Sequence, residues 1–78
     1  MQLADQLPDH DFRGLKCPLP VLKARRALNQ AEAGSRLVIW ADDPAAPLDF
    51  DHFCQTTGHQ LLSQEQKDGL FIFLIEKR

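Results

Sequence analysis

The stretch Gly14-Leu15-Lys16-Cys17-Pro18-Leu19-Pro20 constrains this chain more than any other part of it. Proline has a fixed φ and no backbone N–H, so it is tolerated in the first turn of a helix and disfavoured further in. Pro18 and Pro20 therefore predict the start of a helix, with Cys17 at its N-terminal end. Gly14 supplies the backbone freedom that a sharp turn into this helix needs.

The position of Cys17 predicts a reactive thiol. The unpaired N–H groups and the dipole of a helix N-terminus favour negative charge, and cysteines there or beside cations have a lowered pKa. Arg13 and Lys16 supply positive charge nearby in the sequence. We therefore expect the pKa of Cys17 to lie below its ordinary value, although each proline removes a donor that could have faced the sulfur. The alternative is a buried cysteine that serves as a small hydrophobic residue.

The rest of the chain alternates between strand and helix patterns. Apolar spacing and turn residues predict strands over 10–13, 35–41, 59–66 and 70–76, helices over 18–30 and 47–57, and a hairpin turn over 67–69. A strand-helix-strand unit gives a parallel pair with a right-handed crossover, and a terminal hairpin adds an antiparallel pair. We predict an α/β two-layer sandwich of order βαβαββ, with a mixed four-stranded sheet and two helices packed on one face.

The 78 residues are enough for a single domain, which we expect over 9–78, with a flexible N-terminal tail over 1–8. Residues 36–41 and 70–75 are apolar at almost every position, so part of each strand must face away from the helices. Either the tail or the stems of side chains cover this second apolar face, or the face is a docking or self-association surface.

The sequence disfavours several other interpretations: a secreted or membrane protein, a metal site and a cysteine hydrolase. No apolar run has the length of a signal peptide core or a membrane span, so we expect a cytoplasmic protein with reduced thiols and no membrane partner. The cysteines and histidines lack zinc-site spacing, and we predict no metal and no cofactor. A hydrolase that pairs Cys17 with a histidine is disfavoured because nothing orients one; His10 is the histidine expected nearest to it. Cys54 lies mid-helix beside Phe53 and is expected to pack in the core.

Charge is segregated along the chain. The net charge of −2 argues against direct nucleic-acid binding. Every charged residue between positions 12 and 31 is basic, namely Arg13, Lys16, Lys23, Arg25 and Arg26. Every charged residue between positions 41 and 51 is acidic, namely Asp42, Asp43, Asp49 and Asp51. The basic helix face is either plain solvated surface or a surface that steers an acidic protein partner into contact.

The stretch from Asp11 to Pro20 resembles the signature of the TusA family of small sulfur carriers, in which Gly-Leu-x-Cys-Pro-x-Pro follows the first strand and opens the first helix. The resemblance continues through Ala41-Asp42-Asp43-Pro44-Ala45, Phe53-Cys54 and Gly58-His59, and covers the chain from about Asp9 to Lys77. The fold that this family implies is the one predicted above.

The resemblance implies a sulfurtransferase function. Cys17 would accept sulfur as a persulfide from a cysteine desulfurase or a rhodanese-like donor and pass it to a downstream thiol acceptor, in tRNA 2-thiouridine synthesis, molybdenum cofactor maturation or sulfur oxidation. Gly14, Leu15, Pro18 and Pro20 would position the loop. Partner contacts would come from Arg13, Lys16, Lys23, Arg25 and Arg26, with Asp42 and Asp43 on the partner surface or paired to those cations. The alternative is a non-catalytic redox-sensing or regulatory interaction module.

Overall fold

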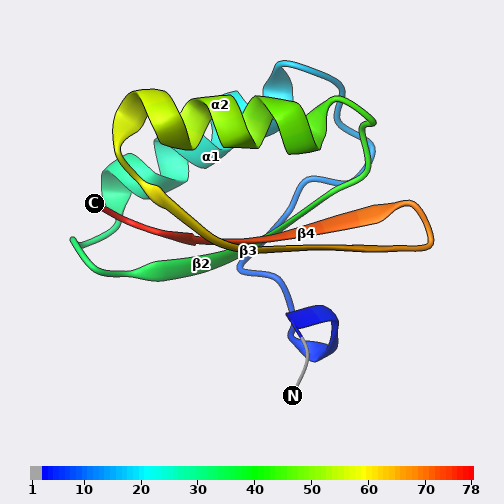
Figure 1. Ribbon diagram of the computed structural model, residues 1–78, viewed down its shortest axis with the longest axis horizontal. Helices are drawn as coiled ribbons and strands as arrows, with labels where there is room; N and C mark the ends of the chain where they lie inside the picture. Colours follow the sequence, from blue (N-terminus) through cyan, green and yellow to red (C-terminus); the bar gives the residue numbers. More distant parts are fainter. Residues whose placement is uncertain (1–2) are drawn as a thin grey trace.

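Four strands form one mixed sheet in the order β1-β2-β4-β3, and two helices cover one of its faces (Figure 1). The structure, a computed structural model, describes residues 3–78. The predicted α/β two-layer sandwich of order βαβαββ is confirmed. The elements are a short 3-10 helix η1 (Leu3–Asp5), β1 (His10–Asp11), α1 (Leu19–Gln30), β2 (Arg36–Ala41), α2 (Ala46–Thr57), β3 (Gln60–Lys67) and β4 (Leu70–Glu76).

The sheet combines one parallel pair with two antiparallel pairs. β1 runs parallel to β2, with His10 opposite Ile39, and β2 runs antiparallel to β4 along its whole length. β3 and β4 form a hairpin that turns at Asp68 and Gly69, both with positive φ (52° and 81°). Two-residue hairpin turns of this kind require positive φ at both positions, which Asp-Gly tolerates. The predicted terminal hairpin is confirmed.

The main core lies between the two helices and the sheet. One residue per turn of α1 faces it, at Pro20, Ala24 and Leu28, because side chains four apart lie on the same side of a helix. From α2, Phe50 is fully buried and packs against Phe73 of β4, with ring centroids 4.5 Å apart and the ring planes tilted by 30°. The rest of this core includes Phe12, Ile39, Ala41, Ala46, Phe53, Cys54 and Ile75.

A second, smaller cluster covers the face of the sheet that points away from the helices. Leu3 of η1 packs there on Val38 and Ile72, and all three are buried. The backbone N–H groups of Leu3 and Ala4 both donate to the carboxylate of Glu65, over 3.2 Å. Burial of Leu3 thus places η1 against the sheet (Figure 1). Residues 1–2 of the expected flexible tail 1–8 lie outside the described residues, and the flexibility of that tail stays a prediction.

The ends of both helices follow the predicted signals to within one residue. Pro18 caps α1 and Pro20 lies in its first turn, where a missing N–H costs no helical hydrogen bond. Gly58 ends α2 with a φ of 83°, a left-handed conformation in which glycine carries no Cβ penalty. Among residues 3–78, neither helix has the length and apolar character needed to cross a lipid bilayer.

Candidate functional site

Cys17 lies at the end of the loop that joins β1 to α1. Phe12 is buried at the start of this loop, and Leu15 packs partly buried against the main core. Between them the chain turns at Gly14, whose φ is 84°. These anchors, together with Pro18 as the N-cap of α1, leave Cys17 exposed at the N-terminal end of the helix, as the sequence predicts.

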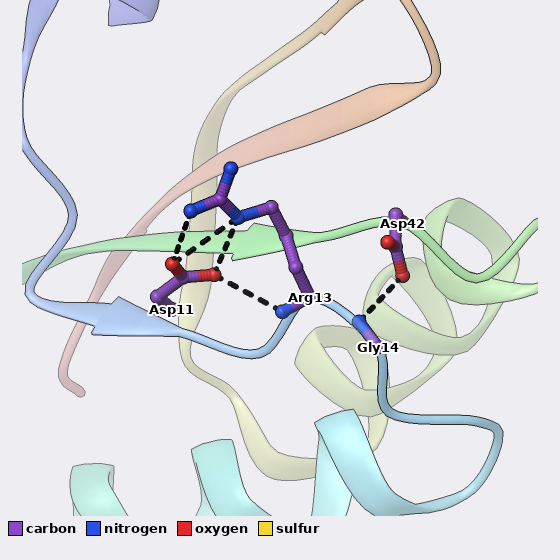
Figure 2. A network of polar contacts seen from close by, with 4 residues as sticks. All are labelled: Asp11, Arg13, Gly14 and Asp42. Atoms are coloured by element: carbon purple, nitrogen blue, oxygen red, sulfur yellow. Dashed lines mark hydrogen bonds and ion pairs between the residues drawn. The ribbon is translucent and has the colours of Figure 1, made fainter.

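Two consecutive aspartates hold the backbone of this loop. Asp42 and Asp43 follow β2, and Asp42 Oδ1 accepts a hydrogen bond from Gly14 N over 3.0 Å (Figure 2). Asp43 Oδ2 accepts one from Cys17 N over 3.1 Å, and Asp43 is only 9% exposed. We expected these carboxylates on the partner surface or paired to cations. In the structure both accept hydrogen bonds from the backbone of the cysteine loop.

The side chain of Arg13 is paired with a carboxylate. Its guanidinium pairs with Asp11, with Nη2 2.7 Å from Oδ2 (Figure 2). It also lies 5.0 Å from the ring centroid of Trp40. Hydrogen bonds from Arg13 lower the pKa of Asp11, and the same pairing raises the pKa of Arg13. The positive charge of Arg13 is thus already paired with Asp11.

Two carboxylates lie close to the sulfur of Cys17. Its Sγ atom and one carboxylate oxygen from each of Asp43 and Asp49 lie within 4.8 Å of one another. Hydrogen bonding to Asp49 raises the pKa of Cys17, and desolvation and the charges of Asp49 and Asp43 act in the same direction. The prediction of a lowered pKa is therefore wrong, because α2 and the turn before it bring negative charge to the thiol from a distant part of the sequence.

An open groove of about 240 Å³ runs from Cys17 along the junction of α1 and α2. The histidine that lines it is His52, whereas His10, which we expected nearest to Cys17, lines a different depression and stacks on Phe12. The groove residues are Cys17, Pro18, Val21, Arg25, Asp49, His52, Phe53 and Thr56. For Asp49 and His52 the sequence predicts no role in the site. The one feature of the sequence that links these two residues is their spacing of three, which places them on the same face of a helix.

The basic residues of α1 divide between two sides of the helix. Arg25 lines the groove beside Cys17 and lies 5.3 Å from the ring centroid of Phe53. Lys23 and Arg26 line the depression that contains His10. These three residues therefore do not form one continuous surface, and Arg25 is the basic residue, among residues 3–78, that lines the groove with the thiol.

Cys54 is separated from solvent in the core, only 6% exposed. Burial raises its pKa to about 11, so it is a protonated, passive thiol at neutral pH. Cys17 is consequently the exposed thiol of the chain.

Three potential metal ligands, Cys17, Asp43 and Asp49, also meet at this point within the described residues. Exposed acidic groups commonly gather without a cation, and Asp43 already accepts a hydrogen bond from the loop. We assign no metal centre to this arrangement, and the absence of a metal cofactor stays a prediction.

The fold and the site define a class of protein. A small two-layer domain presents one cysteine at a helix N-terminus, beside an open groove, and buries its other thiol, so it is a small α/β protein with a single exposed thiol. A family model described as "Sulfurtransferase TusA" matches residues 10–77. This chain belongs to the TusA family.

Individual relatives agree with this assignment. The chain is 46% identical over 68 residues to NMA0882 of Neisseria meningitidis serogroup A, named provisionally as a sulfur carrier, with 87% of this chain and 92% of that protein covered. It is 41% identical over 75 residues to "Sulfur carrier protein TusA" of Allochromatium vinosum, with 96% and 99% covered. The crystal structure of a SirA-like protein from Desulfitobacterium hafniense superposes with a TM-score of 0.72 at 25% identity, covering 86% of this chain and 95% of that one.

Proposed function

We propose that this chain carries sulfur as a persulfide on Cys17. It accepts the sulfur from a cysteine desulfurase or a rhodanese-like donor and delivers it to a downstream thiol acceptor. The single observation that carries the proposal is the exposed Cys17 held at the N-terminus of α1, while Cys54 is buried. Membership of a family whose relatives are named as sulfur carriers supports it.

The loading step is an exchange between sulfur atoms. The Cys17 sulfur, as thiolate, attacks the terminal sulfur of a donor persulfide; the donor's S–S bond breaks, and the donor sulfur leaves with the electron pair. The proton lost by Cys17 ends on the donor thiol, so a thiol and a persulfide are exchanged without net oxidation. Delivery is the same reaction with an acceptor thiol as the attacking group.

The loop supplies the geometry for this exchange. Asp43 and Asp42 fix the backbone at Cys17 and Gly14, and Pro18 fixes the direction in which the chain leaves the cysteine. A transfer between two protein-bound sulfurs needs an accessible thiol, which the open groove provides. The acceptor belongs to one of the pathways that the family serves, namely tRNA 2-thiouridine synthesis, molybdenum cofactor maturation or sulfur oxidation.

A relay experiment separates a sulfur carrier from a passive interaction module. The chain is incubated with a cysteine desulfurase, pyridoxal phosphate and ³⁵S-cysteine, and the label bound to the chain and the affinity for the desulfurase are both measured. Cys17→Ser should lose the label and keep the affinity, whereas the matched Cys54→Ser variant should keep both. Label on Cys17→Ser equal to that on the unaltered chain would overturn the proposal.

A further inference from the structure

Within residues 3–78, the carboxylates of Asp43 and Asp49 beside Cys17 form no ion pair. Asp49 is partly exposed in the first turn of α2, and Asp43 is buried behind the loop. Across residues 3–78 the ion pairs are Arg13 with Asp11 and Arg36 with Glu76, so neither carboxylate beside the sulfur is neutralised by one. Arg25 and His52 also line the groove, and Arg25 lies against Phe53.

We propose that Asp49 is a specificity-determining residue of Cys17: its carboxylate favours sulfur donors and acceptors that bring positive charge to the mouth of the groove and disfavours anionic ones. This inference rests on the proposed function, because it concerns the partners with which Cys17 exchanges sulfur. Asp43 has the same sign of charge, but it is committed to the Cys17 backbone, so Asp49 is the carboxylate that an incoming group can meet.

The physical basis is the charge that develops on the reacting atoms. A sulfur atom attacks as the thiolate, and during exchange negative charge is spread over the attacking, central and leaving sulfurs. Two carboxylates within 4.8 Å of Sγ oppose that charge. A cationic group on the partner offsets this repulsion, whereas an anionic group adds to it.

The two sides of α1 would then contact groups of opposite charge on the partner. Lys23 and Arg26 line the depression beside His10 and form a basic patch at a distance from the groove. A suitable partner therefore combines an acidic area for that patch with a basic side chain for Asp49. Such a two-signed arrangement fixes orientation as well as strength of docking.

Thiol–disulfide exchange with small disulfides of different charge tests the proposal directly. The probes are cystamine (cationic), 2-hydroxyethyl disulfide (neutral) and 3,3′-dithiodipropionate (anionic), at neutral pH and low ionic strength. In each reaction the Cys17 thiolate attacks one sulfur, the S–S bond breaks, and one small thiolate leaves. Each rate is divided by the rate of 2-mercaptoethanol with the same disulfide, which removes the intrinsic reactivity of the probe.

For the unaltered chain the normalised rates should fall from the cationic to the neutral to the anionic probe, with a spread of about tenfold or more. Asp49→Asn should reduce the spread to about threefold or less and speed the neutral probe. Asp51→Asn is the matched control, because it removes the same charge from an exposed position of the same helix, and it should keep the spread. Asp49→Ser provides a second variant, and far-UV circular dichroism checks that each protein is folded.

Two results would overturn the proposal: normalised rates independent of probe charge, or equal spreads in Asp49→Asn and Asp51→Asn. Neither result bears on persulfide loading, because no sulfur donor is present in this assay. Failure of ³⁵S loading, conversely, would leave the charge order of the disulfides measurable.

Discussion

Replacing Asp43 by alanine removes one of the contacts that tie the cysteine loop to the rest of the domain. Asp43 is a buried residue, only 9% exposed, and its carboxylate accepts a hydrogen bond from Cys17 N over 3.1 Å. A hydrogen bond to a charged group contributes about 1.5–3 kcal/mol to stability, so we expect Asp43→Ala to lower the free energy of unfolding by that amount. A loss of this size is about ten- to a hundredfold in the unfolding equilibrium constant, a large part of the stability of a small domain.

Urea denaturation followed by tryptophan fluorescence measures this loss, with Trp40 as the probe. The midpoint should move to lower urea while the slope stays constant, since the same surface is exposed on unfolding. Asp42→Ala is the matched control: its carboxylate is exposed and accepts from Gly14 N over 3.0 Å, and it should cost about 1 kcal/mol or less. If the two variants lose equal stability, or Asp43→Ala loses none, the reasoning about the buried aspartate is refuted.

Three further predictions concern the core, a helix end and the buried thiol. Phe50→Ala, at a fully buried site packed against Phe73, should lower the unfolding free energy by about 3–5 kcal/mol in urea denaturation, and a loss under about 1 kcal/mol would contradict the core assignment. Gly58→Ala should cost about 1–2 kcal/mol in the same assay because its φ of 83° is left-handed; no loss would contradict that conformation. Cys54, with a pKa raised to about 11 by burial, stabilises the fold while protonated, an effect present at neutral pH and lost as the pH rises from about 9 through about 11. The denaturation midpoint should therefore fall more steeply across that window than in Cys54→Ala, and parallel curves would contradict a buried thiol.

The fold was predictable because its signals are local. The strand of residues 70–76 and the Asp-Gly turn before it are specified by apolar content and by positive φ, which depend on a few adjacent residues. The helix limits at Pro18 and Gly58 follow from the special backbones of proline and glycine. The burial of Leu3 on the outer face was one of two options for that face, and sequence alone could not choose between them.

The environment of the thiol depended on contacts between distant segments. Arg13 is four residues from Cys17 in the chain, yet it pairs with Asp11, whereas Asp49 is 32 residues away and lies beside the sulfur. Which side chains lie beside Cys17 depends on which side of the first turn of α1 faces α2. That side is fixed only when both helices pack on the sheet. The sequence motif thus identified Cys17 as the candidate reactive residue, whereas the packing of α2 against α1 determined the charge around its sulfur.

The most direct test of persulfide carriage on Cys17 is the intact mass of the reduced protein after incubation with a cysteine desulfurase, pyridoxal phosphate and cysteine. The account predicts a gain of one sulfur atom, about 32 Da, that is reversed by a thiol reductant, present in Cys54→Ser and absent from Cys17→Ser. No gain in the unaltered chain, or an equal gain in Cys17→Ser, would contradict it.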